Sequence, residues 1–217
     1  MISGALNSNS AATGNASRKR RPEARPAEIL EAALDLFTER GFKATRLEDV
    51  ASRAGLSKAS IYLYFKDKTS LLMALVQATA GANINLAGNM IAQHEGLVAP
   101  LLQQLLEFMA GRIDQSRMPD LMKLVIAESR AHPEIGRFYL DNVIGQALPL
   151  FQSLIERGIA SGEFRPVDPS LTVKCIVGPL VLAALWKSVF VPIGAEPINV
   201  GELARHHADF ILRALKP

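Results

Sequence analysis

Apolar residues recur at intervals of three and four along most of the chain, which is the spacing of one face of an α-helix. No segment shows a comparably strong alternation of apolar and polar residues, the pattern of a half-buried strand. The pattern predicts an all-α fold of about nine helices. The longer helices are expected near residues 68–93, 97–116, 119–131, 133–160, 169–191 and 200–215.

Shorter helices are expected in the first third of the chain. An amphipathic helix begins near Pro26 and is expected to end at Gly41. Thr45 and Glu48 have the spacing of a capping box, in which two side chains satisfy free backbone N–H groups at a helix start. We expect a second helix to begin there and to end at Gly55, since glycine suits a left-handed helix end.

A third short helix is expected over residues 58–64, because Ser57 is a favourable N-terminal cap. Two short helices joined by the turn Ala54-Gly55-Leu56-Ser57, behind a longer amphipathic helix, predict a helix-turn-helix over about residues 46–65. In such motifs the second helix enters the major groove of DNA. Many helical hairpins use the same turn chemistry, so spacing alone leaves DNA binding open.

Charge is distributed unevenly. Residues 1–70 hold 12 Lys and Arg against 8 Asp and Glu, whereas the remainder holds 12 against 13. The net charge of +3 therefore comes from the first third of the chain. Attraction to nucleic-acid phosphates explains this placement, and a solvated charged surface is the alternative.

Residues 1–22 are expected to form a flexible basic tail. Residues 1–17 are rich in Ser, Asn, Ala and Gly and hold few large apolar side chains. Arg18-Lys19-Arg20-Arg21 then give four consecutive positive charges, as in arms that follow a phosphate backbone or enter a minor groove. A tail that only increases solubility fits the same composition.

Residue identities make the DNA-binding interpretation specific. The relevant residues of the segment 26–75 are Thr45, Val50, Ala51, Ala54, Gly55, Leu56, Ser57, Tyr62, Leu63, Tyr64, Phe65, Lys68 and Leu71. With the Gly41 break and the core positions Phe37 and Phe42, this set resembles the DNA-binding domain of the TetR family of bacterial transcriptional regulators. The resemblance implies a DNA-binding domain at about 23–83 and an effector-binding and dimerisation domain at 84–217.

The resemblance implies two groups of DNA-contacting residues. The positions that present the recognition helix to base edges and nearby phosphates are occupied by Lys58, Ala59, Ser60 and Tyr62. The positions that clamp phosphates are occupied by Thr45, Arg46, Tyr64 and Lys68, with Lys66 as an addition and Ser57 at the turn. Capping alone by Thr45 and Ser57, and coverage of the core by Tyr64, are the alternatives.

The pair Ala59-Ser60 departs from the Gly-Thr that is frequent in this family. A different approach of the helix to the groove, and a different operator, are expected from this departure. Lysine donates hydrogen bonds to guanine acceptors or to phosphate, and alanine contacts the methyl group of thymine.

A single recognition helix contacts too few base pairs to select a genomic site, so such proteins usually bind palindromic sites as two-fold dimers. By the resemblance, the homodimer interface is a four-helix bundle formed by about residues 169–191 and 200–215 of each subunit. These segments are rich in apolar residues for the end of a chain. Some of those residues must face the subunit's own core.

The same resemblance implies that the middle helices, about 68–160, enclose a pocket for a small hydrophobic effector. Asn142 and Gln146, four residues apart, are candidates to orient a ligand by hydrogen bonds. Solvent exposure of these amides and ordinary core packing of the apolar candidates are the alternatives. Apolar candidates for the lining, chosen because thioethers and aromatic rings suit irregular ligands, are Phe108, Met109, Met118, Met122, Phe138, Phe151 and Trp186.

The sequence offers little support for catalysis, metal binding or a cofactor. Its histidines are either isolated or, at His206 and His207, directed to different sides of one helix. Cys175 is the single cysteine and lies in an apolar run, where a buried, unreactive thiol is expected. We therefore expect no enzyme, no metal and no cofactor. A helical adaptor that binds an acidic protein partner, and less favourably a helical-bundle enzyme, are the alternative functions.

A cytoplasmic protein without a membrane segment is expected. The first residues hold no apolar run of signal-peptide length. The most apolar stretch, 171–191, has a charge-free middle at 175–186, shorter than the roughly 20 residues that cross a bilayer. Together these patterns predict a ligand-responsive transcriptional repressor that binds a palindromic operator as a homodimer and is released by its effector.

Overall fold

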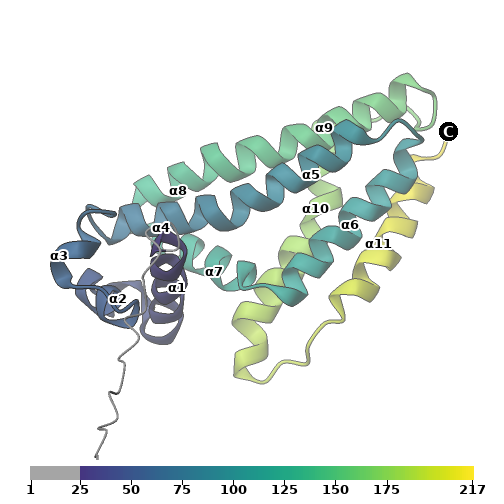
Figure 1. Cartoon of the computed structure of the whole chain (residues 1–217). Helices are drawn as coiled ribbons and strands as arrows, with labels where there is room; N and C mark the ends of the chain where they lie inside the picture. The colour runs from purple at the N-terminus through teal and green to yellow at the C-terminus, as the bar shows by residue number, and fades with distance from the viewer. Residues whose placement is uncertain (1–24) are drawn as a thin grey trace, which may run out of the picture.

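Nine continuous helices make up residues 25–217, the part of the chain that the computed structural model describes. No strand occurs in these residues, so the all-α prediction is confirmed. Figure 1 shows the short N-terminal helices gathered at one end of an elongated bundle of longer helices. We call residues 25–76 the head and residues 77–217 the body. The predicted basic tail, residues 1–22, lies outside the described residues.

The head contains the predicted helix-turn-helix. Gly41, at a φ of 81°, interrupts the first helix, and Gly55, at a φ of 66°, forms the turn between the second and third. The third helix is shorter than predicted, because regular helical structure ends at residue 61 and residues 62–64 continue as turns. The helices are α1 (Arg25–Ala44), α2 (Leu47–Arg53), α3 (Lys58–Ile61) and the start of the fourth, α4 (Lys68–Val76).

The body consists of long helices, several of which contain one π-helical turn. The predicted helices of this region are all present, with ends that differ by a few residues. One helix continues from the head as α4, the π turn η2 (Gln77–Gly81) and α5 (Ala82–Gln93). The others are α6 (Val98–Gln115), α7 (Met118–Glu128), α8 (Pro133–Tyr139) with η3 (Leu140–Ile144) and α9 (Gly145–Ala160), α10 (Pro169–Leu185) with η4 (Trp186–Phe190) and the 3₁₀ turn η5 (Val191–Ile193), and α11 (Val200–Leu215).

Two hydrophobic cores hold the molecule together. The head core is formed by α1, α2, α3 and α4, but it also includes Leu121 and Val125 of α7 and Ile135 of α8. The body core joins α5, α6, α9, α10 and α11. Figure 1 shows α8 and α9 lying beside α4 and α5 along the long axis. The head is thus packed directly onto the body.

Two helices are long and apolar enough to cross a membrane by length and composition, Lys68–Gln93 and Pro169–Ile193. The first buries 44% of its most apolar window inside the structure, whereas the second buries only 28%. The second helix leaves a stripe exposed, and Cys175 lies on it. The expectation of a buried thiol is therefore wrong, because Cys175 is on the same helical face as the exposed Leu171 and Leu182.

Candidate DNA-binding surface and effector cavity

The start of α2 differs from the predicted capping box. Arg46 precedes the helix, and its backbone N–H donates to the Asp49 carboxylate at 3.1 Å. Thr45 is buried, and its hydroxyl donates to the carbonyl oxygens of Gly41 at 2.8 Å and Leu36 at 3.2 Å. The box at Thr45 and Glu48 was wrong by one residue, because the buried Thr45 hydroxyl closes the end of α1 instead.

Lys68 is likewise engaged within the head. Its Nζ donates to the carbonyl oxygens of Phe42 at 2.7 Å, Lys43 at 3.1 Å and Thr45 at 3.3 Å, and lies 4.6 Å from the centre of the Phe42 ring. Burial lowers the pKa of the Lys68 ammonium. The side chains of Thr45 and Lys68 thus stabilise the corner between α1 and α2.

Ser57 caps α3 as predicted. Its hydroxyl accepts a hydrogen bond from the Ser60 backbone N–H at 3.1 Å, and the two serine hydroxyls are 2.7 Å apart. Ser60 is half-buried. The other predicted contact residues are exposed before α2, on α3 or just after it, and we call this set the recognition surface. It consists of Arg46, Lys58, Ala59, Tyr62, Tyr64 and Lys66.

Glu48 of α2 holds two residues of the recognition surface. Its Oε1 lies 3.0 Å from Nζ of Lys58 and accepts a hydrogen bond from the Tyr62 hydroxyl at 3.2 Å. The Lys58 ammonium lowers the pKa of the Glu48 carboxyl, and Glu48 in turn raises the pKa of Lys58. Sequence reasoning assigned Glu48 only to a cap, since its pairing with α3 depends on the angle between the two helices.

A cavity of about 350 Å³ lies in the body, between α5, α6, α7, α9 and α10. Its wall is almost entirely apolar. Five apolar candidates lie in it as predicted: Phe108, Met109, Met118, Met122 and Phe151. The other lining residues are Ala80, Asn83, Ile84, Ala87, Arg112, Tyr139, Val143, Ile144, Ala147, Leu148, Leu150, Lys174, Val177 and Val181.

Four predicted lining residues lie elsewhere. Phe138 packs against the head core, and its carbonyl oxygen accepts a hydrogen bond from the Asn142 amide at 3.0 Å. Gln146 is exposed. Trp186 donates through Nε1 to the Glu196 carbonyl oxygen at 2.9 Å and stacks on Phe190. Asn142 and Gln146 each lie one residue before a lining residue, Val143 or Ala147, so they occupy the neighbouring face of this helix.

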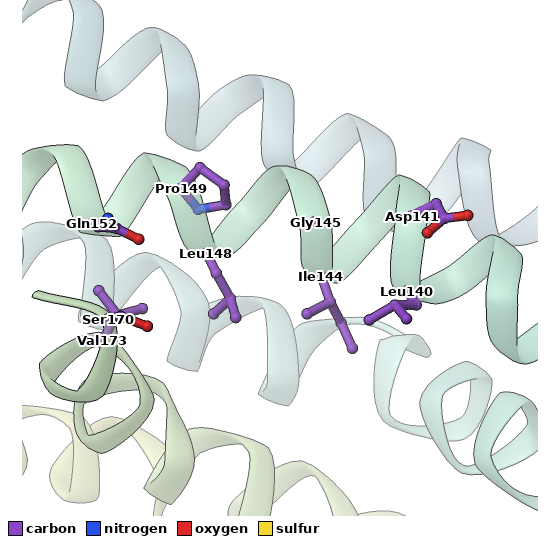
Figure 2. A pocket seen from close by; sticks show the side chains of 9 residues that line it. All are labelled: Leu140, Asp141, Ile144, Gly145, Leu148, Pro149, Gln152, Ser170 and Val173. Atoms are coloured by element: carbon purple, nitrogen blue, oxygen red, sulfur yellow. The ribbon is translucent and has the colours of Figure 1, made fainter.

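An outer pocket of about 420 Å³ adjoins the cavity. Figure 2 shows Leu140, Ile144 and Leu148 pointing from one helix toward the side of Ser170 and Val173. Ile144 and Leu148 line both the outer pocket and the inner cavity. The two pockets therefore adjoin along these side chains, and the exposed Ile144, Lys174 and Val181 show that the cavity itself reaches the surface.

Polar contacts join the head to the wall of the cavity. Arg117, next to the cavity residue Met118, forms an ion pair with Asp35 of α1 and donates to the Thr38 hydroxyl at 2.8 Å. Arg53 of α2 also reaches Asp35, at 3.8 Å. The contacts Arg117–Asp35–Arg53 connect α7, α1 and α2.

Comparisons with known proteins agree with this arrangement. The family model for bacterial regulatory proteins of the tetR family matches residues 29–75, and the tetracyclin repressor-like C-terminal domain model matches residues 95–193. The HTH-type transcriptional regulator YhgD of Bacillus subtilis is 31% identical over 184 residues, covering 78% of this chain and 88% of YhgD.

Solved structures have the same fold. A TetR-family transcriptional regulator from Mesorhizobium loti is 26% identical with a TM-score of 0.72, covering 90% of this chain and 96% of that one. The regulator FadR from Bacillus subtilis, solved with stearoyl-CoA, has a TM-score of 0.74 at 19% identity, covering 87% and 98%. With its helix-turn-helix head and its separate helical body, the chain belongs to the TetR family of bacterial regulatory proteins and is a DNA-binding transcriptional regulator.

Proposed function

We propose that the protein is a homodimeric repressor that binds a palindromic operator and releases it when a small, largely apolar effector enters the body cavity. The observation that carries DNA binding is the recognition surface, where Lys58, Ala59 and Tyr62 are exposed together on a helix-turn-helix. Lys58 donates to guanine or phosphate, and Ala59 contacts a thymine methyl. Arg46, Tyr64 and Lys66 bind phosphates and fix the register of the protein on the duplex.

Glu48 has a defined part in this model. In the free protein it holds Lys58 and Tyr62 in place. On DNA, both donors exchange the carboxylate for phosphate or base acceptors. The contacts with Glu48 thus restrict the Lys58 and Tyr62 side chains before DNA binds. These side chains therefore lose less conformational entropy when they bind the operator.

The dimer is supported by an uncovered apolar stripe on α10 and α11. Leu171, Leu182 and Phe210 are 61%, 56% and 68% exposed, although they belong to helices that pack against each other. When a second copy covers this stripe, α10 and α11 of the two subunits form a four-helix bundle. The dimer then presents two recognition surfaces, one to each half-site of the palindromic operator. As a regulator of chromosomal genes, the dimer acts in the bacterial cytoplasm.

The coupling between effector and operator follows the helices that the head and body share. The helix of 26 residues from Lys68 to Gln93 is about 40 Å long and contributes to the head core and to the cavity wall. Tyr139 and Val143 pack against the head core and also line the cavity. We expect the effector to bind more tightly to a conformation in which the head position does not fit the operator. The free energy of operator binding then falls by the difference between the effector's binding free energies for the two conformations.

Substitution of the recognition surface tests DNA binding. We expect Lys58→Ala and Tyr62→Ala each to weaken binding to the protein's own promoter region about fivefold or more, since one base contact contributes about 1 to 3 kcal/mol. Lys216→Ala, an exposed lysine at the other end of the chain, is the control for charge. Binding is measured by fluorescence anisotropy at one fixed salt concentration, with helicity checked by circular dichroism.

Binding by both variants at the wild-type level would argue against the regulator mechanism proposed here. A wild-type protein that binds an acidic protein partner but not its promoter region would favour the adaptor alternative.

A further inference from the structure

The cavity wall is positively charged. Two basic side chains line it, Arg112 of α6 and Lys174 of α10. No Asp or Glu is among the lining residues. Lys174 is exposed, and its Nζ donates to the backbone oxygen and the hydroxyl of Ser170 at 3.3 and 3.1 Å. Lys174 therefore has both solvent and protein partners.

Arg112 is partly buried and has no such protein partner. Its Nε is buried without a hydrogen bond, and within residues 25–217 no hydrogen bond or ion pair involves the guanidinium. A buried N–H donor without an acceptor costs free energy, so the Nε–H of Arg112 is a group that is normally paired. The apolar neighbours Phe108, Met109 and Phe151 in the same wall cannot accept its protons.

The end of its own helix does not satisfy Arg112 either. Basic residues in a last turn often bind the free carbonyl oxygens there. In α6 three of these oxygens already accept hydrogen bonds: Nζ of Lys187 donates to those of Ile113 and Asp114 at 2.9 and 2.7 Å, and the Ser116 hydroxyl donates to that of Arg112 at 2.5 Å. The fold thus leaves the guanidinium of Arg112 available on the cavity side.

We propose that Arg112 binds the carboxylate of an amphiphilic organic acid whose apolar body fills the cavity. This inference rests on the proposed effector function and names its ligand class. A guanidinium binds a carboxylate through two parallel hydrogen bonds, which lysine cannot reproduce. An uncharged ligand of the same shape leaves the guanidinium unpaired, so the site discriminates strongly for the acid.

A pair of probes with the same chain tests the inference: decanoate, which carries the carboxylate, and 1-decanol, which does not. Calorimetric titration of the full chain is expected to give decanoate binding about tenfold tighter than 1-decanol binding. Arg112→Gln is expected to weaken decanoate binding about tenfold or more, equivalent to about 1.4 kcal/mol, and to leave 1-decanol binding within about twofold. Lys174→Ala, the matched cation in the same wall, is expected to change decanoate binding less than about threefold.

The outcomes separate this inference from the proposed function, because operator binding is measured on the same samples. A wild-type protein that binds operator but not decanoate overturns the acid inference and leaves the regulator intact. An equal loss of both probes in Arg112→Gln, or a larger loss in Lys174→Ala, also overturns it. Arg112→Lys keeps the positive charge but lacks the two parallel N–H donors of the guanidinium, so we expect it to bind decanoate with intermediate affinity. Such binding would show that the cavity is still folded in the variant.

Discussion

The head and the body are both helical and each has a hydrophobic core, but they differ in what surrounds that core. In the head, the short helices α2 and α3 are held at their ends by side chains that bind backbone groups, chiefly Thr45, Ser57 and Lys68. In the body, the long helices α6, α9 and α10 pack around a cavity that they leave unfilled. Fixed helix ends suit a surface that must match groups on DNA, whereas incomplete packing leaves room for a ligand.

The two regions meet in a shared set of residues. Leu121, Val125 and Ile135 belong to the body helices but are buried in the head core. Met122, next to Leu121, lines the cavity. A ligand that shifts α7 must therefore also shift the packing of the head. Three predictions test how far the two regions depend on different interactions.

The largest effect is expected from overfilling the body core. A Cβ atom added at Gly158 of α9 would lie 2.3 Å from the ring of Phe164, which is itself buried. Gly158→Ala is therefore expected to lower the free energy of unfolding by about 1 to 3 kcal/mol. Gly111→Ala is the matched control, since its Cβ would meet nothing within 4 Å and alanine stabilises a helix interior. Thermal unfolding followed by circular dichroism measures both, and equal melting temperatures would refute the packing argument.

A smaller loss is expected from removing one hydrogen-bonding group in the head. Thr45→Val keeps the shape but deletes the hydroxyl that binds the carbonyl oxygens of Gly41 and Leu36. We expect a loss of about 1 to 2 kcal/mol in the free energy of unfolding, and wild-type operator affinity for the folded protein. Thr45→Ser, which retains the hydroxyl, is the control. Weakened operator binding at unchanged stability would instead assign the Thr45 side chain to the DNA contacts.

The smallest effect is expected at the junction. Arg117→Ala removes the contacts with Asp35 and the Thr38 hydroxyl, which are only partly buried, so little change in stability is expected. The decrease in operator affinity caused by saturating decanoate is expected to become about threefold to tenfold smaller, while affinity without decanoate stays the same. Arg130→Ala, another exposed arginine, is the control. An unchanged response to decanoate would exclude this contact from the coupling.

The head was predictable from the sequence to a large extent because its signals are local. Gly41, Gly55 and Ser57 each act within a few residues, and the breaks and cap that they predict are confirmed. The capping box failed because the buried Thr45 hydroxyl binds α1 rather than α2. Lys68 binds oxygens about 25 residues away, and no local pattern reveals such a contact.

In the body, periodicity predicted the helices but only part of the cavity. Phe108, Met109 and Met122 line it, since apolar residues on inward faces are visible as a 3.6-residue period. Asn142 and Gln146 were misplaced because their own spacing of four fits any face of the helix, and the face that lines the cavity is that of Val143 and Ala147. Arg112 gave no signal, because a basic residue in a last helical turn is ordinarily a surface or capping residue.

The amino-acid sequence by itself determined the helical fold and the helix-turn-helix, because these follow from short-range spacing and turn chemistry. Only the tertiary structure decided that Glu48 holds Lys58 and Tyr62, that Thr45 and Lys68 are engaged in the fold, and that Arg112 faces an apolar cavity without a partner. Those features depend on helix crossing angles and on which neighbours occupy each polar atom, and these arise from packing between segments far apart in the chain.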